Sequence, residues 1–219
     1  EITYLCALQA DGSYKQIIKS NNQPHNCWRI VFKKEAKINR FREALITLEI
    51  PYSEYPEDKR GMVSFYVGNP LVKGLLEYKT KTFDSKYILN KSNEWLQAFV
   101  TESWLWDGSI KGSTPIYCTT NKSNVTLLQT VGHIVGYRCR IITSEDSRKD
   151  SYKTYYRLTF VNTNKVSLQN HKKVLSSYRG RVYCVEVPSG KIMIRQKGNI
   201  FITGNCQNLT YHELYSVIT

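Results

Sequence analysis

Two nine-residue stretches, YLCALQADG at residues 4–12 and VTESWLWDG at residues 100–108, are built in the same way. Each is an apolar segment that ends in Asp-Gly, and a serine follows both of them. Glycine readily adopts the left-handed conformation that closes many helices, so we expect two helices that end at Asp11 and Asp107. Asn93 is the expected N-cap of the second helix. The two stretches indicate an internal repeat.

The residues that follow each stretch also show the same order of segments in both copies. Each copy continues with a β-favouring segment, a segment with helical apolar spacing, a short closing segment and a final strand. In the first copy these are residues 29–32, 37–48, 49–52 and 62–67, and in the second they are residues 115–118, 124–135, 136–139 and 155–161. Two units of helix, strand, helix and strand predict an α+β domain with pseudo-twofold symmetry.

The chain is strongly basic. It has 219 residues, with 31 Lys and Arg against 18 Asp and Glu, and a formal net charge of +13. This excess favours a polyanion partner, most simply nucleic acid, although many basic proteins have none. No apolar run approaches the ~20 residues of a membrane span, and no basic-then-apolar leader opens the sequence, so we expect no membrane association. The six cysteines form no C-x-x-C pair, which argues against zinc and favours reduced thiols in a cytoplasm.

The two aspartates carry the strongest chemical signal. A negative side chain at the C-terminal end of a helix is disfavoured, because the helix dipole already places negative charge there. Two helices that end together would bring the carboxylates of Asp11 and Asp107 close enough to repel each other. A divalent cation would relieve this repulsion and could activate water as a nucleophile. For either motif alone, an ordinary Asp-Gly helix end is the alternative.

These two motifs resemble the signatures of a two-repeat LAGLIDADG homing endonuclease of the DOD type, over roughly residues 1 to 170. The resemblance implies two signature helices packed side by side above two saddle-shaped antiparallel sheets that straddle the DNA major groove. It implies double-stranded DNA as partner, Mg²⁺ or another divalent cation as cofactor, and a monomeric nuclease with internal symmetry. Asp11 and Asp107 would be the catalytic metal ligands. Glu102 and Trp106 stand where the family prefers small residues.

Strand alternation suggests which side chains contact the DNA. Basic residues on the strands after each motif could face phosphates or base edges, and each of them could also be ordinary solvated surface. The candidates are Lys15, Arg29, Lys33, Lys111, Arg138, Arg140 and Arg157.

A second kind of chemistry is indicated from about residue 176. Three short strands with Pro-Ser-Gly and Lys-Gly-Asn turns are expected there, which could simply be a terminal β-meander. The segment also resembles the C-terminal splicing motifs of inteins, and so a β-rich piece of a Hint-type splicing domain. The resemblance implies that Asn205 cyclises to a succinimide and that Cys206 is the nucleophile that accepts the upstream segment. Gly204 and Cys184 stand where inteins often have His and Asp, and would support splicing.

The resemblance divides the chain into an endonuclease domain at residues 1–175, a splicing segment at 176–205 and a C-extein at 206–219. The C-extein resembles a stretch of PhoH-like phage ATPases. No N-terminal splicing motif is present, so we expect the C-terminal part of an intein, complemented in trans by an N-terminal fragment if it is split. A bacterial or phage-infected cytoplasm is the expected location. The alternative function is a degenerate, non-cleaving DNA-binding remnant that retains only the C-terminal splicing role.

Overall fold

The computed structural model describes residues 1–18, 24–57, 61–68, 72–77, 79–145, 154–162, 177, 179–181 and 187–204. The chain divides into two compact units, Glu1–Thr163 and Asn164–Thr219. The first unit holds both predicted repeats. In the part of the chain that is described, no helix is long and apolar enough to cross a membrane.

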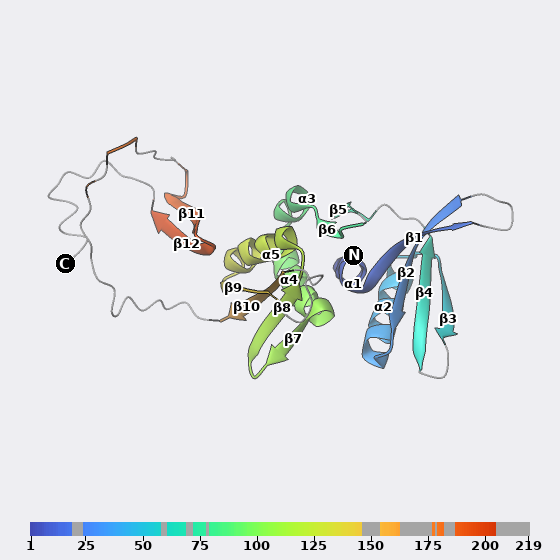
Figure 1. The fold of residues 1–219 in the computed structure, drawn as a ribbon. Helices are drawn as coiled ribbons and strands as arrows, with labels where there is room; N and C mark the ends of the chain where they lie inside the picture. The colour runs from blue at the N-terminus through green and yellow to red at the C-terminus, as the bar shows by residue number, and fades with distance from the viewer. Residues whose placement is uncertain are drawn as a thin grey trace. The chain divides into compact units, whose positions relative to one another are not determined.

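The two halves of the first unit have the same order of elements (Figure 1). The first half comprises α1 (Ile2–Asp11), β1 (Gly12–Ile18), β2 (Pro24–Phe32), α2 (Glu35–Thr47), β3 (Tyr52–Glu57) and β4 (Met62–Gly68). The second half comprises α4 (Asn93–Asp107), β7 (Gly108–Lys111), β8 (Thr114–Thr119), α5 (Lys122–Ile134), β9 (Arg138–Ser144) and β10 (Tyr155–Val161). Between them lie β5 (Leu75–Glu77), β6 (Thr82–Phe83) and α3 (Ser85–Leu89).

Each half contributes one antiparallel sheet of four strands. The strand orders β1-β2-β4-β3 and β7-β8-β10-β9 are equivalent, which confirms the α+β fold with pseudo-twofold symmetry. The sequence predicts fewer strands, because the closing segments at residues 49–52 and 136–139 reach only the first residues of β3 and β9, and β1 and β7 are not predicted. The repeat unit is therefore helix, two strands, helix and two strands.

The signature helices lie at the centre of the unit. Helix α1 packs against α4, and each of them continues without a loop into the first strand of its own sheet. The buried side chains form one continuous core that includes both helices. Burial of these apolar side chains is the main source of the stability of the unit.

The glycine at each helix end has a different role from the predicted one. Gly12 has φ −69° and ψ 143°, and Gly108 has φ −149° and ψ −165°, so both are extended and the left-handed prediction is wrong. Glycine is required there by crowding. A Cβ atom on Gly12 would lie 2.4 Å from Leu8 O, and one on Gly108 would lie 2.0 Å from Ile116 O. The helix-to-strand junction leaves no room for a side chain.

The start of α4 also differs by one residue. Asn93 is the first residue of the helix, and the N-cap is Ser92, whose hydroxyl accepts a hydrogen bond from Trp95 N at 3.3 Å. Serine and asparagine cap helices equally well, so the sequence alone does not separate the two positions.

Two tryptophans of α4 join the halves of the core. Residues two apart on a helix point about 200° apart, so Trp104 and Trp106 face opposite sides of α4. Trp104 packs against Phe160 of its own half, with ring centroids 5.1 Å apart. Trp106 packs against Phe32 and Phe41 of the other half, with ring centroids 5.4 and 6.4 Å apart.

Glu102 lies one turn before Trp106, on the same side of α4. Its carboxylate accepts a hydrogen bond from Trp106 Nε1 at 3.0 Å and forms a two-point ion pair with Arg40 of α2. Glu102 is 8% exposed, and a carboxylate buried to that extent is tolerated only when donors surround it. The two large residues of the second motif are thus accommodated by the first half of the molecule.

The second unit contains the hairpin of β11 (Lys191–Gln196) and β12 (Asn199–Gly204). Its turn residues Lys197 and Gly198 have φ 48° and 80°, as a two-residue hairpin turn requires. This agrees with two of the three predicted strands and with the Lys-Gly-Asn turn. Most of the remaining predicted strand, which contains Cys184 and precedes β11, lies outside the described residues.

Replacing Gly108 with alanine tests the crowded junction. Because the Cβ atom would overlap backbone atoms, we expect Gly108→Ala to lower the free energy of unfolding by about 2 kcal/mol or more. Ser109→Ala, at the exposed neighbouring position, should change it by less than about 0.5 kcal/mol. Chemical denaturation measures both values. Equal stability of the two variants would contradict the crowding argument.

Candidate metal and nucleic-acid site

The two aspartates meet because of how the signature helices end. Asp11 is the last residue of α1 and Asp107 is the last residue of α4, and the two helices pack against each other. The negative charge of Asp11 helps to raise the pKa of Asp107, so the two carboxylates interact electrostatically. Both predicted residues therefore stand at the last positions of two packed helices, near enough for their charges to interact.

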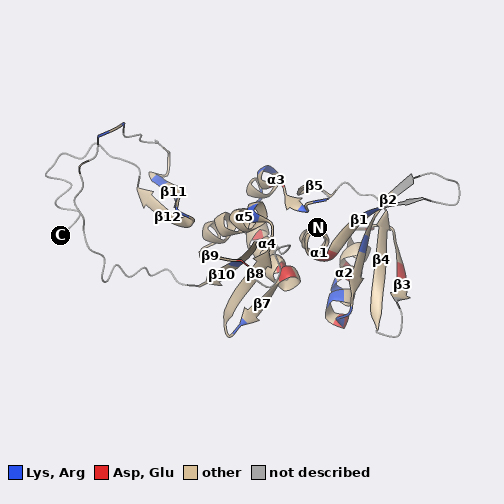
Figure 2. Cartoon of the chain, in the orientation of Figure 1, with Lys and Arg blue, Asp and Glu red and all other residues tan. Residues whose placement is uncertain are grey.

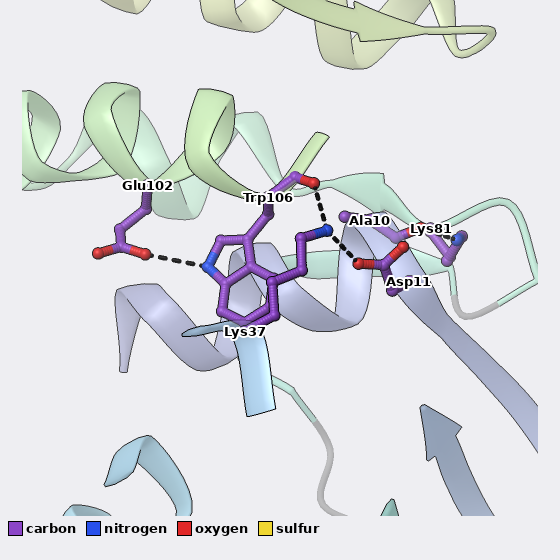
Figure 3. Close-up of polar contacts among 6 residues, drawn as sticks. All are labelled: Ala10, Asp11, Lys37, Lys81, Glu102 and Trp106. Carbon is purple, nitrogen blue, oxygen red and sulfur yellow. Dashed lines mark hydrogen bonds and ion pairs between the residues drawn. The ribbon is translucent and has the colours of Figure 1, made fainter. Parts of the chain in front are cut away.

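Lys37 connects the two helix ends. Its Nζ lies 2.7 Å from Asp11 Oδ2 and 2.9 Å from the carbonyl oxygen of Trp106, so one ammonium group joins α1 to α4 (Figure 3). Its side chain comes from the first turns of α2 and is 25% exposed. The ammonium also lies 5.4 Å from the centroid of the Trp106 ring, within the range of a cation–π interaction.

Lys81 lies on the other side of the site. Its Nζ donates a hydrogen bond to Ala10 O at 2.8 Å. Burial lowers the pKa of Lys81, while the negative charges of Asp107 and Asp11 act in the opposite direction. Ala10 precedes Asp11 and Trp106 precedes Asp107, so the two lysines bind equivalent carbonyl groups of the two motifs.

The backbone of Lys81 is held in an unusual conformation. Its φ of 53° is in the left-handed region, which costs a non-glycine residue on the order of 1 kcal/mol. Asn124 of α5 offsets this cost, because its Nδ2 donates to Lys81 O at 2.9 Å and its Oδ1 accepts from Phe83 N at 2.9 Å. Asn124 is fully buried, and through these hydrogen bonds the start of α5 positions the backbone of Lys81.

Asp107 is the less exposed of the two carboxylates. Burial is the main cause that raises its pKa from 3.8 to about 6, and the charge of Asp11 adds to the effect. Lys81 and Lys37 act in the opposite direction. Asp107 lines an open cavity of about 350 Å³, together with residues that include Lys81, Cys118 and Tyr155.

The donor set suits a hard divalent cation. Carboxylate and backbone carbonyl oxygens are the ligands that Mg²⁺ and Ca²⁺ prefer, and Mg²⁺ usually keeps several waters beside one or two carboxylates. Among the described residues there is no group of three or more His, Cys, Asp or Glu side chains that could hold a metal ion. Asp11 and Asp107 are the carboxylates that could hold such a cation, with backbone carbonyl groups and water as further ligands.

Most of the predicted DNA contacts lie on strands of the two sheets, and Lys and Arg segments are present in both halves (Figure 2). Side chains alternate across a strand, and directly paired residues share a face. Lys15 pairs with Cys27, which is two residues from Arg29, so Lys15 and Arg29 share a face of the first sheet.

The same argument applies to the second sheet. Its strand register places four candidates on one face, opposite the buried Leu158 and Phe160, and these are Lys111, Arg138, Arg140 and Arg157. Lys33 lies just after β2 and is exposed.

The remaining site predictions concern splicing. Gly204 is the exposed last residue of β12, whereas Asn205, Cys206 and Cys184 lie outside the described residues.

Sequence reasoning missed Lys37 and Lys81. Neither lies in a motif, and each reaches the site from an element distant in sequence. Two carboxylates at adjacent helix ends repel each other and are stabilised by nearby positive charge. The sequence does not indicate which lysines supply that charge. Only the packing of α2 and the placement of residues 80–83 by Asn124 and Asn121 identify them.

Comparison with known proteins supports the fold. No protein-family model matches the chain. It is similar to the homing endonuclease I-DmoI in complex with DNA and Ca, with a TM-score of 0.53 and 13% identity over 73% of this chain and 81% of that one. It is also similar to mesophilic variants of I-DmoI, with a TM-score of 0.51 and 14% identity over 73% of this chain and 86% of theirs. The predicted LAGLIDADG endonuclease fold is confirmed.

A curated relative has a different name. The ribonucleoside-diphosphate reductase subunit beta of Aquifex aeolicus (strain VF5) is 28% identical over 224 residues. The match covers 98% of this chain but only 31% of the relative. The chain thus spans about a third of the length of that protein.

The raised pKa of Asp107 predicts a pH-dependent stability. The native state holds this proton up to about pH 6 and the unfolded chain releases it near 3.8, so the stabilisation is complete below pH 3.8 and is lost as the pH rises through 6. Asp107→Asn stays neutral at every pH. Between pH 3.5 and pH 7.5, the free energy of unfolding of this variant should therefore rise relative to that of wild type by about 2–3 kcal/mol. Each tenfold change in proton affinity corresponds to about 1.4 kcal/mol.

Denaturant unfolding in the presence of a chelator measures this difference at both pH values. Glu43→Gln, which removes an exposed carboxylate of α2, is the matched control and should show little change with pH. A constant difference between Asp107→Asn and wild type would show that the carboxyl of Asp107 titrates normally.

Proposed function

We propose that the first unit is a divalent-metal-dependent endonuclease that cleaves double-stranded DNA. The observation that carries this proposal is the convergence of Asp11 and Asp107, one from each half, at the ends of two packed helices and among two lysine ammonium groups. The fold it shares with I-DmoI, which has been studied in complex with DNA and divalent metals, supports the assignment.

The chemistry follows from the charges. A divalent cation supplies Lewis-acid activation of the phosphate and of the attacking water. Asp11 and Asp107 would supply the carboxylates that hold it, one from each half of the site. One carboxylate from each half also suits a substrate with two strands, since each strand presents its own scissile phosphate. Lys37 and Lys81 offset negative charge at the site, where phosphate oxygens would add more.

The basic faces of the two sheets supply the binding surface in this proposal. Lys15 and Arg29 on one sheet and Arg140 and Arg157 on the other are placed to contact phosphates or base edges of a duplex. Neutralising phosphates releases counterions, so binding should weaken steeply as salt is raised. This surface makes use of the net charge of +13.

A plasmid assay tests the nuclease. The substrate is a supercoiled plasmid in Mg²⁺ buffer that carries the coding sequence of residues 206–219 within its gene, from which the sequence that encodes the resembled intein has been removed. We expect wild type to produce linear DNA, and Asp11→Asn and Asp107→Asn each to lower the rate by about 100-fold or more, as loss of a group that stabilises transition-state charge does. Glu43→Gln is the control and should cleave like wild type.

The alternative function makes a different forecast in the same experiment. A non-cleaving DNA-binding remnant would bind the plasmid in a gel-shift assay and leave it uncut. The same rate for wild type and both aspartate variants would also contradict the proposed catalytic role.

We further propose that the C-terminal segment takes part in protein splicing, in which Asn205 cyclises and Cys206 acts as nucleophile, with an N-terminal intein fragment in trans if the intein is split. A thiol suits this transesterification because it is nucleophilic even when only partly ionised. Two observations support the idea: the β11–β12 hairpin ends at Gly204, directly before Asn205, and similar sequence lies within a longer polypeptide whose name indicates another activity.

Mass spectrometry of the incubated chain tests the role of Asn205. Cyclisation of Asn205 cuts the 205–206 bond, so wild type should release a peptide that begins at Cys206. Asn205→Ala should release none. Asn199→Ala, an asparagine in the same hairpin, is the control and should release the peptide at the rate of wild type. Release from Asn205→Ala at that rate would exclude the proposed chemistry.

A further inference from the structure

The ammonium group of Lys37 occupies a cation site. It is bound by one carboxylate oxygen, Asp11 Oδ2 at 2.7 Å, and one carbonyl oxygen, Trp106 O at 2.9 Å, and these come from opposite helices (Figure 3). Hard oxygen donors of this kind are the ones a divalent cation requires. The ammonium therefore takes up ligands that a metal ion at Asp11 would need.

The position of Lys37 is supported by packing. Its ammonium lies 5.4 Å from the ring centroid of Trp106 and 6.0 Å from that of Phe32, and its side chain is three-quarters buried. Trp106 stands where the resembled motif has a small residue, and its carbonyl and its ring both contact Lys37. The departure from the motif and the resident lysine are thus parts of one arrangement.

The other half of the site differs. Lys81 binds the carbonyl oxygen of Ala10, and it acts on Asp107 through its charge. Asp11 is engaged by a direct ion pair of 2.7 Å with Lys37. The two halves of the site therefore differ: a lysine binds the carboxylate of Asp11 directly, whereas Lys81 binds a carbonyl oxygen.

We propose that Lys37 is a built-in competitor of the divalent cation at Asp11, so that the Asp11 side is the weaker metal site and a metal ion binds there only by displacing the ammonium. This inference rests on the proposed metal-dependent function. A charged hydrogen bond must be broken for the metal to enter, which lowers its affinity by about tenfold, or 1.4 kcal/mol.

Calorimetric titration of the full chain with Ca²⁺, without DNA, tests the proposal. Lys37→Met keeps the apolar stem of the side chain and removes the ammonium, so Ca²⁺ should bind about tenfold more tightly than in wild type. Lys34→Met, which removes an exposed lysine just before α2, should bind Ca²⁺ within about twofold of wild type. Unchanged or weaker binding by Lys37→Met would overturn the proposal.

Two further measurements keep the test decisive. Acetylation of Lys37 in wild type, read by mass spectrometry, should rise when Ca²⁺ is added, because the displaced amine becomes accessible; no rise would overturn the proposal even if Lys37→Met fails to fold. Asp11→Asn distinguishes a failure of the proposed role of Lys37 from a failure of the proposed metal site. Absence of Ca²⁺ binding in wild type, Lys37→Met and Asp11→Asn alike would overturn the proposed metal site itself, and with it the role of Lys37.

Discussion

The close packing of α1 against α4, each with an aspartate at its last residue, is the constraint on which the rest of the site depends. Both carboxylates stand at the negative ends of helix dipoles and repel each other. The ammonium groups of Lys37 and Lys81 offset part of this charge: Lys37 binds Asp11 Oδ2 and Trp106 O, and Lys81 binds Ala10 O. The site is an arrangement of charge that folding alone would not favour, which is typical of functional sites.

The second signature helix shows how a degenerate motif retains the fold. Large residues at a close helix contact would separate the helices, but Trp106 inserts into the aromatic cluster of Phe32 and Phe41. Glu102 is satisfied by Arg40 and by the Trp106 indole. These contacts join α4 to the opposite half, so Glu102 and Trp106 connect the two repeats. The two halves thus share the same order of helices and strands but differ in the side chains of their signature helices.

That asymmetry bears on function. In the proposed nuclease, two half-sites that differ in burial and in lysine contacts would bind a cation unequally. Asp107 lines a cavity and burial raises its pKa to about 6, whereas Asp11 is paired with Lys37. The splicing segment adds a separate chemistry to the same chain in our proposal, and its two reacting residues directly follow the hairpin.

The repeat, the α+β class and the two aspartates could be predicted from the sequence, because apolar periodicity and an Asp-Gly helix end are local signals that occur in both copies. It also identified basic residues whose strand register later placed them on common faces. Tertiary structure decided the rest. The extended glycines, the destinations of Trp106 and Glu102, and above all Lys37 and Lys81 depend on contacts between residues tens of positions apart. Local sequence carries no record of such contacts, because the energy that selects them arises only when the two halves pack together.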